Sequence, residues 1–251
     1  MVPYIRLVDL QDEYVLNHYI YNNPEVNYYF TDDWSAEMYE MLAFAGFISI
    51  TTKDELKNEY ILPEMQFSYA VLTWDNLYIS KRIKKLIKRH VLGKNNYSIT
   101  INKDIDAVFK KLELYHDGKN WLSQKYLRML KECNNFNNNF NLISVELWDD
   151  KTLIAGEIGY SIGSTYTSLT GFFDKENYSD FGKIQLYALA LILKESGFKI
   201  WNMGHPYMDY KFKMGAKEYQ RLDFLNIWKK HRDDKRVILK DSMLKDLKDL
   251  L

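Results

Sequence analysis

Six cationic side chains crowd one short stretch of this chain, between positions 81 and 89. Ile83, Leu86 and Ile87 recur among them, so residues 79–90 predict an amphipathic helix with a narrow apolar stripe. The chain has a formal net charge of zero, so any attraction for an anionic partner must be local. A solvated basic helix and a phosphate-binding surface are both open interpretations, and the stripe is too narrow to favour a membrane-surface helix. The cations are Lys81, Arg82, Lys84, Lys85, Lys88 and Arg89.

The remaining reactive side chains indicate neither a metal nor a cofactor. Histidines occur at positions 18, 90, 116, 205 and 231, and none is spaced from another histidine or a cysteine as zinc ligands are. The chain has no GxSxG, Walker A or GxGxxG motif. The segment DKENYSDFGK, which leads into a predicted helix, is acidic and suits the diphosphate of coenzyme A poorly. We therefore expect no metal and no cofactor.

The stretch 144–216 predicts the elements that position the chemistry. Residues 143–148, 153–160 and 165–173 are three β-favouring segments separated by the turn sequences DDK and GS, which predicts two consecutive hairpins. Apolar residues then recur at helical spacing from 184 to 193, Gly197 suits the end of that helix, and residues 199–203 predict a strand. This order predicts an α+β (mixed α/β), acyltransferase-like fold.

The sequence predicts that the chain has three parts. Residues 1–75 form a small accessory domain with a helix over 35–45, a short strand, and irregular extended chain over 61–74. Residues 76–234 form the acyltransferase domain, with a further strand over 96–101 and helices over 103–114 and 120–133. Residues 222–231 predict a strand or short helix. Residues 235–251 predict an amphipathic helix with Leu239, Met243, Leu247 and Leu250 on one side.

Composition bears on the compartment. Cys133 is the single cysteine of the 251 residues, which fits a reducing cytosol because no internal disulfide can form. The charged N-terminus has no apolar segment of a signal peptide, and no stretch is long and apolar enough to span a bilayer. We expect a cytoplasmic monomer without a membrane partner.

Several short motifs in a fixed order give the chain a resemblance. They are AVLTWDNLYISKRIKKLIKR, NWLS, SVELW, AGEIGYSIG, an FF pair before a helix, and GFKIW followed by MGA, and the resemblance runs from about residue 44 to residue 228. Together they resemble the leucyl/phenylalanyl-tRNA–protein transferase family, whose catalytic domain is GNAT-like. Its members move an amino acid from aminoacyl-tRNA to the N-terminal amine of a protein. The resemblance implies that the basic helix faces the tRNA acceptor arm and that Trp121 lines the aminoacyl pocket.

Several positions depart from the family pattern. Thr170 stands where the family has a pocket glutamate, and Met203 and His205 stand where it has an aspartate and a glutamine implicated in the chemistry. A pocket tryptophan falls at Ile50. Glu157 replaces an apolar methionine of the leucine/phenylalanine side-chain pocket. The segment PYMDYKFKMG resembles the arginyl-tRNA–protein transferases, a related GNAT-like family.

Glu157 leads us to expect an arginine donor. A buried carboxylate facing a leucine would be unpaired or forced to take a proton, at a cost of several kcal/mol. Facing a guanidinium, it would gain a bidentate charge-assisted pair. Acceptors with N-terminal Asp or Glu, marked for degradation, follow by analogy. The open alternative is that Glu157 points outward or pairs with a lysine.

The expected reaction is aminolysis of an ester, in which the acceptor's α-ammonium must lose a proton. An imidazole titrates near neutral pH, so His205 could take or relay this proton; alternatively it only orients the loop before Pro206. Holding the amine and the ester together could itself supply much of the rate. Asp209 could bind the acceptor amine, Tyr210 the terminal adenosine, and Phe172 could form a pocket wall.

Three other functions compete with arginyl transfer. One is a leucyl/phenylalanyl transferase that tolerates Glu157 at the pocket rim. Another is a catalytically silent tRNA-binding protein that keeps the basic helix. A small-molecule N-acyltransferase is disfavoured, because the diphosphate loop is missing.

Overall fold

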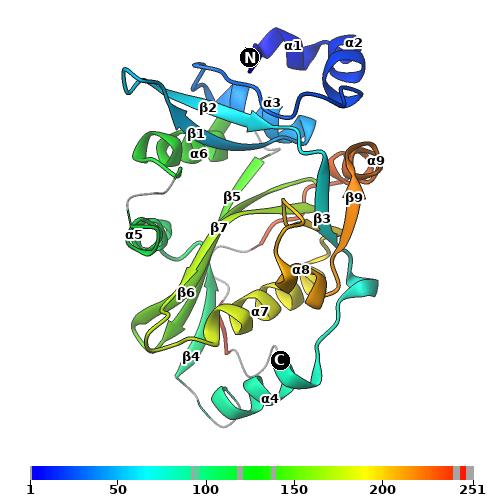
Figure 1. Cartoon of the computed structure of the whole chain (residues 1–251). Helices are drawn as coiled ribbons and strands as arrows, with labels where there is room; N and C mark the ends of the chain where they lie inside the picture. Colours follow the sequence, from blue (N-terminus) through cyan, green and yellow to red (C-terminus); the bar gives the residue numbers. More distant parts are fainter. Residues whose placement is uncertain are drawn as a thin grey trace.

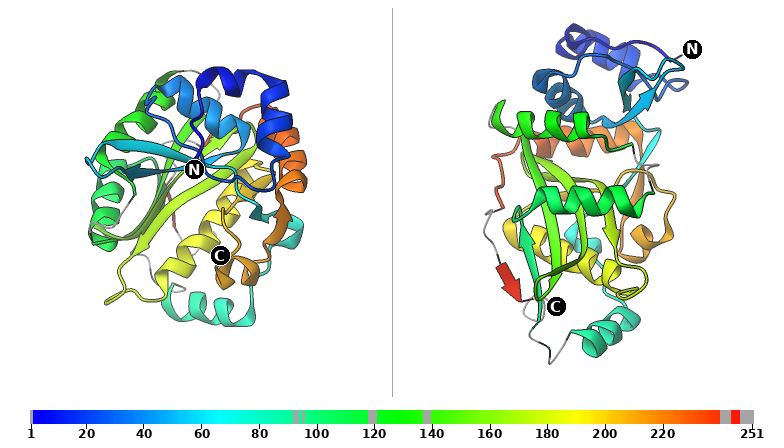
Figure 2. Two further views of the ribbon diagram at one scale, coloured as in Figure 1. Left: turned by 45° about the horizontal axis from the view of Figure 1, so that its top comes forward. Right: turned by 90° about the vertical axis from the view of Figure 1, so that its left-hand side faces the viewer.

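The computed structural model describes residues 2–91, 94, 96–117, 121–136 and 140–239, together with the backbone of 244–246. Within these residues one large sheet has the strand order β10-β4-β5-β6-β7-β8-β3-β9, and β1 and β2 form a separate small sheet (Figure 1). Helices α5 and α7 lie on opposite faces of the large sheet (Figure 2). The α+β, acyltransferase-like fold class is confirmed.

The helices are, in chain order, α1 (Leu7–Gln11), α2 (Glu13–Val15), the π-helical turn Leu16–Tyr21, α3 (Ala36–Ala45), α4 (Lys81–His90), α5 (Ile105–Tyr115), α6 (Gln124–Phe136), α7 (Phe181–Ser196), α8 (Asp209–Lys213) and α9 (Arg221–Arg232). The strands are β1 (Ile48–Lys53), β2 (Glu59–Glu64), β3 (Ser68–Leu72), β4 (Tyr97–Ile101), β5 (Phe140–Asp149), β6 (Thr152–Ile162), β7 (Thr165–Phe173), β8 (Ile200–Asn202), β9 (Lys217–Gln220) and β10 (Leu244–Asp246).

The centre of the sheet follows the predicted pattern. Strands β5, β6 and β7 pair antiparallel as two consecutive hairpins. Gly197 ends α7 with a φ of 96°, in the left-handed region where a side chain would be strained. Helix α7 then returns the chain so that β8 pairs parallel to β7.

The parallel pairing of β7 with β8 is short, and its length shapes the site. It joins Thr165 with Ile200 and Thr167 with Asn202, and it ends there. The other edge of β8 pairs antiparallel with β3. Strand β7 continues to Phe173, so β7 and β8 diverge beyond the carboxyl end of β8. Ligands in α/β sheets commonly bind at such carboxyl ends.

Some predicted elements differ from the structure. Residues 61–74, expected to be irregular, include most of β2 and all of β3, because β3 finds partners in β8 and β9. The helix predicted over 235–251 is wrong for the described residues. Residues 235–239 have no regular structure, Val237 donates its N–H to the Gly163 carbonyl, and Leu244–Asp246 pairs with β4. Strand pairing at the edge of β4 replaces the helix.

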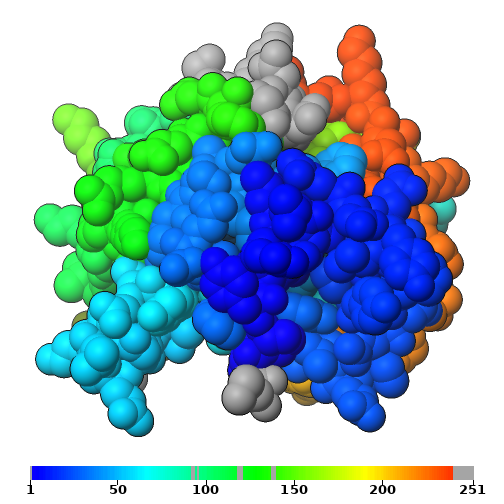
Figure 3. Space-filling model, turned by 90° about the horizontal axis from the view of Figure 1, so that it is seen from above, coloured from blue at the N-terminus to red at the C-terminus, as the bar shows by residue number. Residues whose placement is uncertain are grey.

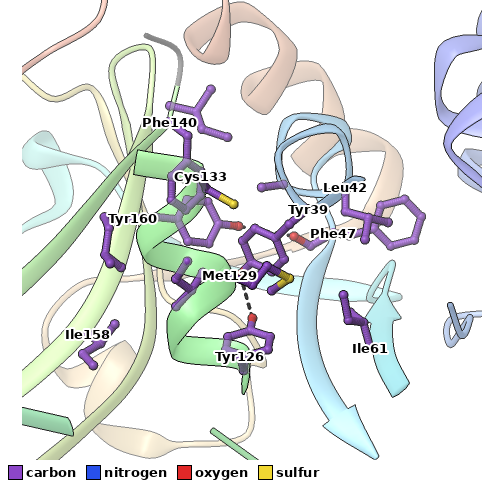
Figure 4. Close-up of a cluster of buried hydrophobic side chains, with 14 of the residues drawn as sticks. Tyr39, Leu42, Phe47, Ile61, Tyr126, Met129, Cys133, Phe140, Ile158 and Tyr160 are labelled. Atoms are coloured by element: carbon purple, nitrogen blue, oxygen red, sulfur yellow. Dashed lines mark hydrogen bonds between the residues drawn. The ribbon is translucent and has the colours of Figure 1, made fainter. Parts of the chain in front are cut away.

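The first 75 residues share their core with the rest of the chain. Figure 4 shows Tyr39 of α3 facing Tyr126 of α6, and their hydroxyls lie 2.7 Å apart. Tyr160 of β6 and Phe140 of β5 belong to the same cluster. Seen from above, the N-terminal segment covers this end of the molecule and the β1–β2 hairpin projects beside it (Figure 3).

One buried guanidinium ties the N-terminal segment to α9. Arg221 is 5% exposed, and its donors reach only backbone carbonyl oxygens in the contacts described. Burying a cation is costly unless its hydrogens find acceptors, and here the carbonyls supply them. The acceptors are the carbonyls of Ile20 at 3.2 Å, Asn23, Val26 at 2.9 Å, Met65 at 2.7 Å and Gln66 at 3.1 Å.

Arg221→Met should therefore lower the free energy of unfolding by about 3–5 kcal/mol, because several carbonyls lose their donor at once. Urea denaturation followed by circular dichroism measures this. The exposed Arg128→Met on α6 is the control and should stay within about 0.5 kcal/mol of the wild type. Equal stabilities of the two variants would contradict the role given to Arg221.

Candidate active site

Glu157 lies on the α7 face of the sheet, where β7 and β8 begin to diverge. It is 3% exposed. The hydroxyls of Tyr166 and Ser168 donate to its Oε1 at 2.7 and 2.8 Å, and the Gln185 amide of α7 donates to its Oε2 at 3.4 Å. The Ser168 hydroxyl also accepts from the Trp201 indole at 2.8 Å. Both oxygens of the Glu157 carboxyl group thus accept hydrogen bonds from protein donors.

Tyr210 of α8 lies close to this carboxyl group. Burial and the charge of Glu157 raise the pKa of Tyr210 to about 12, so its phenol stays protonated at neutral pH. Its neighbour Asp209 is exposed, and its Oδ2 lies 3.5 Å from the ammonium of Lys213 one turn later. Tyr210 therefore borders the site, whereas Asp209 lies at the surface beside it.

Thr170 and Phe172 occupy the opposite face from Glu157. The register pairs Glu157 with Gly171, and neighbouring residues of a strand point to opposite faces. Phe172 is 5% exposed and packs in the core cluster that includes residues of α5. The residues expected in one pocket are thus divided between two faces of the sheet.

A histidine stands beside Thr170 on this second face. His116, which follows α5, has its Nε2 3.2 Å from the Thr170 hydroxyl. Burial, and then the charge of Lys175, lowers the pKa of His116, which favours a neutral ring. Trp121 is half-buried after α5 and packs edge to face on Tyr126, with ring centroids 5.3 Å apart.

The loop after β8 is held by a buried lysine. Lys211 is 6% exposed, and its Nζ donates to the carbonyls of Met203 at 2.5 Å and His205 at 2.6 Å. Burial lowers the pKa of Lys211 to about 8. Met203 is buried, and its N–H donates to the Ala70 carbonyl of β3 at 2.9 Å. These bonds fix the backbone that carries His205.

His205 itself reaches toward the N-terminal segment. Its Nε2 lies 2.8 Å from Oε2 of Glu64, the last residue of β2, and its side chain is 35% exposed. Its ring stacks on Tyr207 with centroids 4.8 Å apart and an interplanar angle of 13°. A partly open imidazole paired with a carboxylate can take up and release a proton.

The basic run forms α4, as predicted. Ser80 caps the helix by accepting from the N–H of Ile83, and Ile83, Leu86 and Ile87 are buried. All six cations of residues 81–89 are exposed. Arg89 also lies 3.2 Å from Asp180, so part of its charge is balanced. Helix α4 lies at the far end of the molecule from the N-terminal segment (Figure 1).

Two further findings concern the described part of the chain. No three His, Cys, Asp or Glu side chains in it gather as metal ligands would. None of its helices has the length and apolar character that crossing a membrane requires.

Comparison with known proteins shows the family. The model of the family described as leucyl/phenylalanyl-tRNA protein transferase matches residues 71–229, which is more than half of the chain. The chain belongs to this transferase family. The matched stretch runs from β3 to α9 and includes every site residue described above except Glu64. The expectation of an arginyl transferase is therefore wrong, since the match is to leucyl/phenylalanyl transferases.

Two relatives named leucyl/phenylalanyl-tRNA–protein transferase illustrate this similarity. The Flavobacterium johnsoniae protein is 28% identical over 162 residues, which cover 63% of this chain and 71% of the relative. The Shewanella sediminis protein is 28% identical over 236 residues, which cover 88% and 91%. Among solved structures, L-PGS from Bacillus licheniformis matches with a TM-score of 0.40 and 12% identity over 67% of this chain and 49% of that chain.

The sequence did not reveal the partners of the expected site residues in this transferase. Tyr166 and Ser168 alternate along β7, so the hairpin register could have placed them beside Glu157. Gln185 is a polar residue inside an apolar helical pattern, which is also a readable signal. His116 and Glu64 carry no such signal, because only tertiary packing brings them to the site.

The burial of Glu157 predicts a pH effect on stability. Burial raises the pKa of Glu157, and its three hydrogen bonds lower it by less. The pKa of Glu157 is thus higher in the folded protein than in the unfolded chain. The free energy of unfolding therefore falls as the pH rises from the pKa of the unfolded state through the pKa of the folded state. Glu157→Gln has no carboxyl group to ionise, so its free energy of unfolding should not show this fall. Between pH 4 and pH 8 the difference in free energy of unfolding, variant minus wild type, should therefore increase by about 1 kcal/mol or more.

Urea denaturation at pH 4, 6 and 8 measures the effect. The matched control is Glu176→Gln, which removes an exposed carboxylate, and its curve should run parallel to that of the wild type. A Glu157→Gln curve that is also parallel would show that the carboxyl group ionises equally in the folded and unfolded states.

Proposed function

We propose that this protein transfers leucine or phenylalanine from an aminoacyl-tRNA to the N-terminal α-amine of an acceptor protein. The observation that carries the proposal is the family match over residues 71–229, which spans the whole region where β7 and β8 diverge. The relatives' names give the donor and the type of acceptor.

The surroundings of Glu157 support an apolar donor. A carboxylate without partners would oppose a leucine or phenylalanine side chain. Here Tyr166, Ser168 and Gln185 already donate to its two oxygens. Glu157 therefore needs no guanidinium from a substrate, and we propose that it organises the α7 side of the site.

The opposite side of the sheet offers apolar surface to the donor. Trp121 and Leu169 are half-buried and pack against the core cluster that contains the buried Phe172, so Trp121 and Leu169 supply this surface. In this proposal the aminoacyl side chain lies toward Trp121, and Thr170 with its partner His116 borders it. An aromatic wall suits leucine and phenylalanine because both gain by burying apolar area.

A transfer assay tests the donor. Purified protein is incubated with labelled leucyl-, phenylalanyl- or arginyl-tRNA and peptides that differ in their first residue. We expect transfer from leucyl- or phenylalanyl-tRNA to exceed transfer from arginyl-tRNA at least about a hundredfold, because a guanidinium would lack a free carboxylate.

The other outcomes separate the competing functions. Preferred transfer of arginine would contradict the proposal. Binding of tRNA without transfer from any of the three donors would instead indicate a silent tRNA-binding protein.

Helix α4 is the proposed contact with the tRNA backbone. Phosphate contacts from Lys and Arg release counterions, so affinity falls steeply with salt. All six cations of residues 81–89 in α4 are exposed. The whole chain has a formal net charge of zero, so the chain outside these six cations carries an excess of acidic residues, which makes this surface the candidate for the acceptor arm.

Replacing Lys84, Lys85 and Lys88 by Ala should weaken tRNA binding about tenfold or more near 0.1 M salt and should reduce the slope of log K against log salt by about 2–3. Filter binding over a salt series measures both. The double substitution of the exposed Lys53 and Lys57, in the β1–β2 hairpin region, is the control and should change neither. An unchanged slope in the α4 variant would place the tRNA elsewhere.

A further inference from the structure

A buried carboxylate from the N-terminal segment contacts the histidine that follows β8. Glu64 is 5% exposed, and its Oε2 lies 2.8 Å from the Nε2 of His205. We propose that Glu64 is a positioning residue for His205, and that this imidazole moves the proton during transfer. The inference rests on the proposed function, and it adds to the site a residue outside the matched stretch 71–229.

The contact between Glu64 and His205 selects one tautomer of the imidazole ring. An ionised carboxylate only accepts hydrogen bonds, so Nε2 of His205 must carry the hydrogen that points at Glu64. In the neutral ring Nδ1 then holds the lone pair, and Nδ1 is the atom that can take a proton. The same carboxylate stabilises the imidazolium that forms afterwards.

Several contacts keep the pair in place. The second oxygen of Glu64, Oε1, accepts from the Asn27 amide at 2.9 Å. The ring of His205 stacks on Tyr207, and its carbonyl accepts from Lys211. The histidine side chain is nevertheless 35% exposed, so part of its ring is open to a substrate. A fixed but accessible base is what general acid–base catalysis requires.

The remaining charged and titratable groups around the pair also restrain it. Burial, and then the charge of Glu64, raises the pKa of Tyr28 to about 12, so this phenol stays neutral beside the carboxylate. Arg221 binds the carbonyls of Met65 and Gln66, which directly follow Glu64. The backbone at Glu64 is therefore held by a buried cation.

The proposed step is aminolysis of the aminoacyl ester. The acceptor's α-ammonium gives one proton to Nδ1 of His205, and the freed amine attacks the carbonyl carbon of the aminoacyl ester. A C–N bond forms, and the ester C–O bond to the ribose breaks. The ribose oxygen takes the proton from Nδ1, and the nitrogen releases its second proton to water. The products are a peptide bond and a free ribose hydroxyl.

Steady-state transfer kinetics of four variants test this role. His205→Ala removes the imidazole that takes the proton, and it should lower kcat about a hundredfold with little change in KM. Glu64→Gln should lower kcat about tenfold, and Glu64→Asp should restore part of the loss. The double variant Glu64→Gln with His205→Ala should be no slower than His205→Ala alone, because Glu64 acts only through the imidazole.

Glu59→Gln, at the other end of β2, is the control and should transfer at the wild-type rate. A thermal melt of each variant separates a loss of catalysis from a loss of folding. The ¹⁵N spectrum of the histidine rings gives an independent signature: His205 should carry its hydrogen on Nε2 in the wild type and should shift toward the other tautomer in Glu64→Gln.

An active wild type with unchanged Glu64→Gln kinetics would overturn the positioning role alone. Additive losses in the double variant would do the same. A wild type that transfers neither leucine nor phenylalanine would overturn the proposed function, and the positioning role with it.

Discussion

The guanidinium of Arg221 is the contact on which the arrangement of the N-terminal segment depends. Arg221 begins α9, yet its donors reach carbonyls of residues 20–26 and 65–66, far away in sequence. Planar geometry lets one side chain serve several acceptors, and burial makes each of those bonds expensive to lose. Because Glu64 precedes Met65, the same contact also sets the position of the carboxylate that meets His205.

The second constraint is the short parallel pairing of β7 with β8. Helix α7 must return the chain across the sheet, and the pairing lasts only from Thr165 to Thr167. Beyond it the strands diverge, and polar groups cluster on both faces of β7. Glu157 and its donors lie on the α7 face, whereas Thr170 and His116 lie on the α5 face.

Glu157 shows why a substitution alone is a weak guide to a substrate. A carboxylate in place of a methionine predicts a cationic ligand only if the carboxylate lacks protein partners. Tyr166, Ser168 and Gln185 are such partners. The residues next to Glu157 in the sequence do not by themselves indicate that all three donate to it. The arginine expectation, which the family match overturned, assigned to a ligand hydrogen bonds that protein donors already make.

The sequence by itself determined the order of hairpins, α7 and β8, the basic helix with its apolar stripe, and the family, because periodicity and turn residues act over a few positions. It could not decide that β3 lies between β8 and β9, or that residues 244–246 extend the sheet instead of a helix, because those pairings join distant segments. Only the tertiary structure decided which polar groups meet. The contacts of Glu64 with His205 and of Thr170 with His116 arise from packing between elements, and a linear pattern carries no information about such contacts.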